Sequence, residues 1–100
     1  MNGKIKSESV DRLFNAIMSL KSLEECYAFF EDVCTVHELK AMAQRLDVAA
    51  MLVEDRTYAD IGEATGASTA TISRVNRCLQ YGADGYQLVF NRLKPDKADG

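Results

Sequence analysis

Apolar residues in this chain recur at steps of three and four positions, the spacing that places them on one face of an α-helix. The first such pattern covers residues 10–21, and Ser9 is its expected N-cap. A second helix is expected to start after Ser22, because Ser22 and Glu25 have the S-x-x-E spacing of a capping box. The second helix presents a further apolar face made of Leu23, Cys26, Tyr27, Phe30, Val33 and Cys34.

The third pattern is the longest and runs from residue 36 to about residue 53, after a second capping box formed by Thr35 and Glu38. The C-terminal half of this helix is apolar on most sides. Residues 10–53 therefore carry more apolar surface than a small domain can cover by itself. We expect them to be the dimer-forming part of a homodimer, packed against a second copy of the chain.

Two short helical patterns are joined at a glycine in residues 57–79, and we interpret them as a helix-turn-helix. Thr57 is the expected N-cap of the first helix, residues 58–65. Gly66 is expected to end that helix in a left-handed backbone conformation, which costs glycine little. The second helix then runs from residue 69 to residue 79.

The apolar residues of the helix-turn-helix predict a small core between its two helices. Ile61 of the first helix is placed to meet Ile72 and Val75 of the second. Gly62 is costly in a helix interior, by about 1 kcal/mol relative to alanine. We therefore expect the second helix to cross closely at Gly62, where a side chain would push the helices apart.

The remaining surface of the second helix suits the major groove of DNA. Its hydroxyls and arginines can bind phosphates or base edges, and small side chains let the helix approach thymine methyl groups. The residues expected on this surface are Thr69, Ala70, Thr71, Ser73, Arg74 and Arg77. The alternative is a helical protein-interaction module that never binds DNA.

The end of the chain predicts one more helix, in residues 84–93, with Asp84 as its N-cap. Residues 95–100 are polar and are expected to form a flexible tail. No strand pattern interrupts these elements. The sequence therefore predicts an all-α single domain of six helices.

Charge is distributed unevenly along a chain whose formal net charge is −3. Residues 1–55 carry six Lys and Arg against ten Asp and Glu, whereas residues 56–94 carry five against three. The basic excess thus falls on the part expected to contact double-stranded DNA, and two subunits would double it.

Other chemistry has little support in the sequence. The spacing Cys34-x-x-His37 supplies two metal ligands where a structural zinc site needs four, and His37 is the only histidine. We expect no metal, no cofactor and no catalytic residue, and hence no enzyme. The three cysteines, Cys26, Cys34 and Cys78, are expected to be reduced and buried. No apolar run suggests a membrane span or a signal peptide, so the expected location is the cytoplasm.

Residues 67–79, ASTATISRVNRCL, resemble the recognition helix of the Trp repressor superfamily, and ATISR is the most specific part. The similarity extends back through residues 44–46, Gln-Arg-Leu, and looks closest to the YerC/YecD-type branch. The resemblance implies a six-helix Trp-repressor-like fold and a dimer with interlocked N-terminal helices. It also implies a repressor that binds a palindromic operator through paired helix-turn-helix units.

Matched residue by residue, the resemblance implies operator contacts by Thr69, Ala70, Thr71, Ser73 and Arg74, together with Tyr58 and Ala59 at the start of the preceding helix. The tryptophan-responsive members hold their ligand between two arginines, which correspond to Arg45 and Arg74.

Two positions of that ligand site differ in this chain. Val75 stands where those members have a glycine beside the ligand ring, and Cys78 replaces a serine that helps hold the amino group. We therefore expect no dependence on tryptophan. The sequence does not identify any other small-molecule effector.

Overall fold

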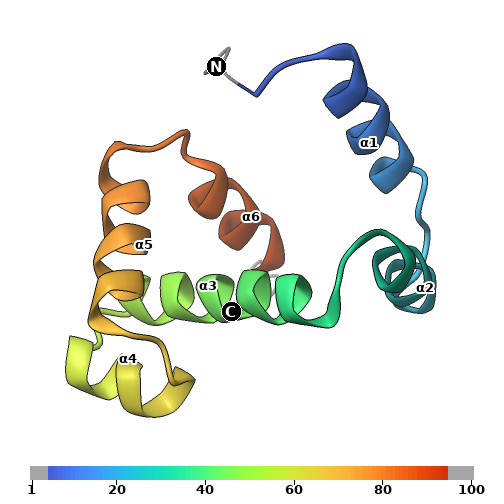
Figure 1. Ribbon diagram of the computed structural model, residues 1–100. Coiled ribbons are helices and arrows are strands. Elements are labelled where there is room, and N and C mark those ends of the chain that lie inside the picture. The colour runs from blue at the N-terminus through green and yellow to red at the C-terminus, as the bar shows by residue number, and fades with distance from the viewer. Residues whose placement is uncertain (1–4, 95–100) are drawn as a thin grey trace, which may run out of the picture. The chain divides into compact units, whose positions relative to one another are not determined.

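A computed structural model describes residues 5–94, in which the chain forms six α-helices and no strand (Figure 1). The predicted all-α fold class is confirmed. The chain divides into two compact units, Met1–Ala41 and Met42–Gly100, each of which we describe by itself. The predicted flexible tail, residues 95–100, lies outside the described residues.

The first helix, α1, covers Glu8–Met18, and its N-cap is Ser7 rather than the predicted Ser9. The backbone N–H of Val10 donates to Ser7 Oγ at 3.1 Å. Ser7 is the better cap because it leaves Glu8 and Asp11 in the first turn, where negative charge offsets the positive end of the helix dipole. The helix also ends earlier than predicted.

Two capping boxes fix the starts of α2, Leu23–Val33, and α3, Val36–Val53. At α3 the bonds are reciprocal: Glu38 N–H donates to Thr35 Oγ1 at 3.0 Å, and Thr35 N–H donates to Glu38 Oε1 at 2.8 Å. The Thr35 N–H bond lowers the pKa of the Glu38 carboxyl. At α2 the Glu25 carboxylate accepts from the N–H of Lys21 instead. The sequence pattern was thus a reliable guide to both helix starts.

The helices α1 and α2 contain no buried residue. Their large apolar side chains are instead open to solvent, with exposed fractions of 48% for Phe14, 73% for Met18 and 73% for Leu23. Burial of apolar area is the main term that offsets the conformational entropy lost on folding. Within their own unit these two helices therefore leave apolar area uncovered.

The core lies in the second unit, which contains the C-terminal half of α3 with α4, α5 and α6. Its buried side chains come from three neighbouring elements and from the turn between α4 and α5: Val48, Ala49, Ile61, Ala67, Ile72 and Val75. Met51, Leu52, Leu79, Tyr86 and Phe90 pack around this cluster. The predicted contact of Ile61 with Ile72 and Val75 in one core is confirmed.

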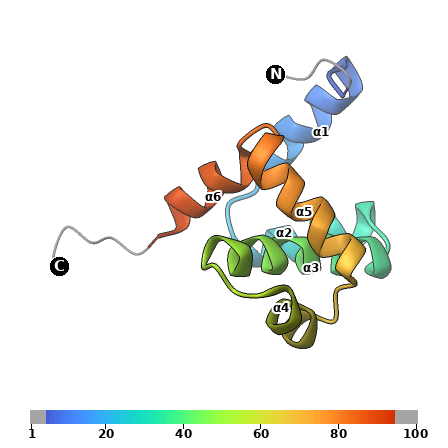
Figure 2. The ribbon, with the colours of Figure 1, turned by 90° about the vertical axis from the view of Figure 1, so that its left-hand side faces the viewer.

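The helices α4, Tyr58–Thr65, and α5, Thr69–Tyr81, are joined by a short turn (Figure 2). Gly66 ends α4 with φ +75°, the left-handed conformation expected of it. Asp55 adopts a similar φ of +62° at the end of α3, where its N–H donates to Leu52 O. The next N–H, that of Arg56, donates to Met51 O, which completes a Schellman motif.

The last helix, α6, covers Gly85–Leu93. Asp84 occupies the N-cap position, but its side chain makes no capping hydrogen bond, so that part of the prediction is wrong. The reason is its φ of +64°, since a capping side chain needs an extended backbone to reach the free N–H groups. Gly82 is the C-cap of α5, and only glycine fits there because a Cβ would come within 2.4 Å of the Cys78 carbonyl oxygen.

The expected close crossing of α5 at Gly62 is also wrong. A Cβ built on Gly62 would have the Ala67 carbonyl oxygen as its nearest neighbour, at 3.5 Å, which is an ordinary contact. That oxygen belongs to the turn and not to α5. The separation of the two helices is therefore set by the buried isoleucine and valine side chains.

Gly62→Ala should accordingly raise the free energy of unfolding by about 0.5–1 kcal/mol, because alanine loses less backbone entropy in a helix and meets no obstacle. Urea denaturation followed by circular dichroism would measure the change. The matched control is Gly66→Ala, which should destabilise the protein because of the left-handed backbone at that position. A loss of stability in Gly62→Ala would show that α5 does approach this position closely.

Candidate nucleic-acid interface

The turn between α4 and α5 is held by hydrogen bonds from Thr65. Its hydroxyl donates to the Ile61 carbonyl oxygen at 2.7 Å and accepts from the N–H of Ala67 at 3.1 Å. The Thr65 carbonyl oxygen accepts from Gln44 Nε2 of α3 at 3.1 Å. The turn is thus fixed within itself and tied to α3. Sequence reasoning missed both roles, because threonine at a helix end and glutamine within a helix are unremarkable in pattern.

Ser68 caps α5, as its position after the turn indicates. Its Oγ accepts from the N–H of Thr71 at 3.1 Å and donates to Thr71 Oγ1 at the same distance. Thr71 is half-buried, and it is hydrogen-bonded to the residue that caps its helix. The other residues predicted to contact DNA on this helix are exposed. The hydroxyl proton of Thr71 is still available to an acceptor outside the helix.

One side of α5 is buried and the opposite side is free. Ile72 and Val75 are each 1% exposed and face the core. The opposite side carries exposed residues at helical spacing, namely Thr69, Ala70, Ser73, Arg74 and Arg77. We call these five residues the outer face of α5. It combines hydroxyls, guanidinium groups and one small side chain, the kinds of group that contact phosphates and base edges.

The two arginines of the outer face are free to bind an external anion. Within residues 5–94, neither Arg74 nor Arg77 has a carboxylate within ion-pair distance. Arg56 differs, because it lies 3.9 Å from a carboxylate oxygen of Glu54 and 4.0 Å from one of Asp60. Arg45, Arg92 and Lys94 also have no carboxylate within that distance, and they lie on α3 and at the end of α6, so α5 carries two of the five cations without an ion pair in this part of the chain.

The first turn of α4 contributes Tyr58 and Ala59, both exposed. The hydroxyl oxygen of Tyr58 accepts a hydrogen bond from Asn76 Nδ2 of α5 at 3.3 Å. Asn76 was not among the predicted site residues. It lies one turn after buried Ile72 and exposed Ser73, at the border between the two sides of α5. No sequence pattern distinguishes a polar residue at such a border.

The four residues considered for a ligand site lie in different environments. Val75 is enclosed in the core, Arg74 is on the outer face of α5, and Arg45 is half-buried on α3. Cys78 is exposed, so its expected burial is wrong, although all three cysteines are free thiols. Cys26 and Cys34 are half-buried.

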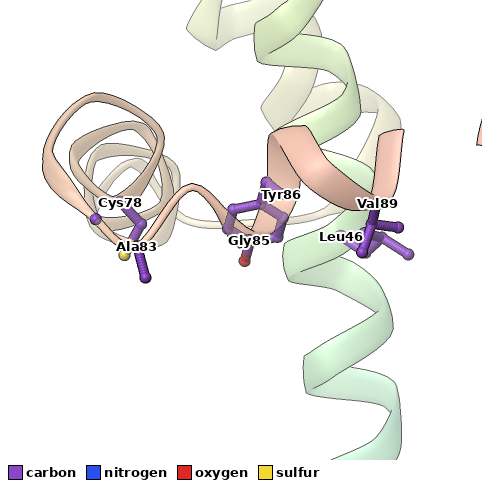
Figure 3. A pocket seen from close by; sticks show the side chains of 7 residues that line it. Leu46, Cys78, Ala83, Gly85, Tyr86 and Val89 are labelled. Atoms are coloured by element: carbon purple, nitrogen blue, oxygen red, sulfur yellow. The ribbon is translucent and has the colours of Figure 1, made fainter. Parts of the chain in front are cut away.

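Cys78 borders an open hollow of about 420 Å³, whose remaining lining residues are Leu46, Gly82, Ala83, Gly85, Tyr86 and Val89 (Figure 3). The lining comes from α3, α5, α6 and the segment before α6, and it is mainly apolar. None of the other three residues considered for ligand binding lines this hollow. The hollow offers no charged group to a polar ligand.

Two further features of the described part of the chain concern metal ions and membranes. Residues 5–94 contain no group of three or more His, Cys, Asp or Glu side chains placed to hold a metal ion. None of the helices in the same range combines the length and the apolar character needed to cross a membrane.

Comparison with known proteins places this geometry in a family. Residues 8–94 match the family model of the Trp repressor protein. The chain is 54% identical over 96 residues to the uncharacterised protein YerC of Bacillus subtilis, a match that covers 96% of this chain and 92% of that protein.

Two crystal structures agree with this assignment. A TrpR-like protein from Eubacterium eligens shares 63% identity with a TM-score of 0.89, covering 92% of this chain and 95% of that one. A candidate Trp repressor from Staphylococcus aureus shares 49% identity with a TM-score of 0.88, covering 93% and 94%. The matched family is one of DNA-binding regulators and not of enzymes. This chain, in which α4 and α5 are joined by the turn at Gly66, belongs to the Trp repressor family.

Proposed function

We propose that this protein is a sequence-specific regulator of transcription that binds a palindromic operator as a homodimer and acts as a repressor. The observation that carries the proposal is the outer face of α5, which presents hydroxyls and two unpaired arginines on the side opposite the core. In this proposal α4 and α5 form the DNA-binding helix-turn-helix, and the protein works in the cytoplasm.

The residues of the two helices would have different roles on DNA. The recognition helix of such a motif lies in the major groove with its N-terminal residues at the base edges, while the first helix crosses the backbone. Thr69, Ala70 and Ser73 would therefore lie at or near the bases with Arg74, and Thr71 would contact a phosphate through its free hydroxyl proton. Tyr58 and Ala59, at the start of α4, would lie against the backbone.

The exposed apolar residues of the N-terminal helices support the proposed dimer. Phe14 and Met18 of α1 and Leu23 and Tyr27 of α2 are between 48% and 73% exposed, and neither helix has a buried residue. Each such side chain gains about 1.5–3 kcal/mol when it is fully removed from water. A second copy of the chain, interlocked through residues 10–53, would supply the missing cover and pair two α5 helices about a twofold axis.

We infer further that DNA binding does not require tryptophan. Val75 is 1% exposed and belongs to the core cluster with Ile61 and Ile72. Its side chain therefore stabilises the packing of α5 against α4 without a ligand. The glycine of the tryptophan-responsive members would leave that space open beside the ligand ring. Arg45, Arg74 and Cys78 are the candidate residues for binding a different small-molecule effector.

Arg74→Ala should weaken binding to the operator by about 1–3 kcal/mol per half-site and relax the preference for one base pair in each, as expected for a guanidinium that binds a base edge. Arg77→Ala, if Arg77 binds only phosphate, should weaken binding to all sequences and reduce the salt dependence. Fluorescence anisotropy on an operator selected from genomic fragments would measure both. The matched control is Arg92→Ala on α6, and an Arg74→Ala affinity equal to that of the control would contradict the assignment.

The proposed dimer predicts that the thermal unfolding midpoint rises with protein concentration, because dissociation and unfolding are then coupled. Sedimentation velocity should give twice the mass of one chain at micromolar concentration. Phe14→Glu should weaken the dimer by placing a charge in its interior, whereas Arg12→Glu, at an exposed position of the same helix, should leave it intact. A stable monomer with ordinary unfolding would contradict paired half-sites.

A further inference from the structure

A single side-chain pair connects the start of α4 to the middle of α5. Asn76 Nδ2 lies 3.3 Å from the hydroxyl oxygen of Tyr58, and within residues 5–94 no other hydrogen bond between two side chains joins these helices. Tyr58 is the first residue of α4, directly after its cap, Thr57. The bond therefore fixes the first turn of α4 relative to α5.

The direction of this hydrogen bond determines what the tyrosine can still do. The Asn76 amide donates and the phenolic oxygen accepts, so the hydroxyl proton of Tyr58 is not used by the bond. Tyr58 is 37% exposed, which leaves its outer edge accessible from solvent. The pair thus presents a hydroxyl whose oxygen is held in place and whose proton can be donated to an external acceptor.

The location of the pair indicates the kind of acceptor. Asn76 follows Ser73 of the outer face by three positions, so the hydroxyl lies beside that face and not within it. A group at the start of the first helix of a helix-turn-helix meets the sugar–phosphate backbone, whose oxygens are hydrogen-bond acceptors. A base edge in the major groove would instead be reached from α5 itself.

We propose that Asn76 is a positioning residue that holds the Tyr58 hydroxyl, and that this hydroxyl donates to a phosphodiester oxygen of the bound DNA. The inference rests on the proposed function. It adds a residue to the DNA-binding unit and gives the tyrosine a specific role, that of a neutral, sequence-independent contact. A neutral donor displaces no counterion by its own charge, so it contributes affinity without changing the salt dependence.

The test compares Tyr58→Phe, Asn76→Ala and the double variant in anisotropy titrations against the selected operator and an unrelated duplex. Each single variant should lose about 3- to 10-fold in affinity per half-site, the size expected for one hydrogen bond, which is about 10- to 100-fold for the dimer on both duplexes, with an unchanged salt slope. The double variant should lose no more than the larger single loss, because both changes remove the same contact. Tyr81→Phe, on an 81% exposed tyrosine at the end of α5, is the matched control and should bind as the unmodified protein does.

A second measurement separates a phosphate contact from a brace between the helices. A scan of operators with single methylphosphonate linkages should reveal one linkage in each half-site whose modification weakens binding of the unmodified protein but not of Tyr58→Phe. Unmodified affinity of Tyr58→Phe on both duplexes, losses that multiply in the double variant, or equal sensitivity of both proteins at every linkage would each overturn the proposal.

The outcome also distinguishes this inference from the proposed function. If the unmodified protein binds DNA and Arg74→Ala weakens it while Tyr58→Phe does not, only the role of the tyrosine is overturned. If the unmodified protein binds no duplex at low salt, both are overturned.

Discussion

The packing of Ile72 and Val75 of α5 against Ile61 of α4 is the contact on which the rest of the DNA-binding unit depends. All three side chains are almost completely buried, and each removes apolar area from water worth about 1.5–3 kcal/mol. Because these positions lie on one side of α5, burying them decides which residues face outward. The outer face is therefore a consequence of the core, and a rotation of α5 would expose valine and isoleucine while burying arginine.

Polar contacts refine what the core establishes. The hydrogen bond from Gln44 to the Thr65 carbonyl oxygen ties the turn to α3, and the bond from Asn76 to Tyr58 ties the start of α4 to α5. Each is worth only about 0.5–1.5 kcal/mol to stability, so neither could set the fold alone. Their value is geometric, because they hold in place the two ends of α4.

The N-terminal helices, α1 and α2, differ from the DNA-binding unit because they contain no buried residue. The start of each is defined by a capping bond, yet both leave large apolar side chains exposed within their own unit. A buried core thus exists only in the unit that bears the outer face of α5, while α1 and α2 present the surface proposed for a second copy. The division of labour in the proposed function follows from this distribution of apolar burial.

Much of this structure could be predicted from the sequence, because local signals fix the helices. The bounds of α3 and α4, the left-handed Gly66 and the inward position of Val75 all follow from spacing and capping chemistry. The errors arose where tertiary geometry overrides a local pattern. Gly62 faces only the turn oxygen, and Asp84 has a left-handed backbone and makes no capping hydrogen bond with its side chain.

The site was partly predictable for the same reason. The outer face of α5 follows from the apolar spacing of that helix, whereas the partners of Thr65 and Tyr58 lie 21 and 18 positions away in the sequence. No periodicity connects such residues. The exposure of Cys78 likewise depends on where α6 and α3 lie around α5, which the pattern within α5 does not contain.

The central claim is that side chains of the protein itself hold α5 ready to bind DNA. The most direct measurement is the affinity of extensively dialysed protein for its selected operator, with and without tryptophan at millimolar concentration, together with calorimetric titration of tryptophan into the free protein. Binding should be tight in both cases, with an unchanged dissociation constant and no measurable heat. Operator binding that appears only when tryptophan is added would contradict this claim.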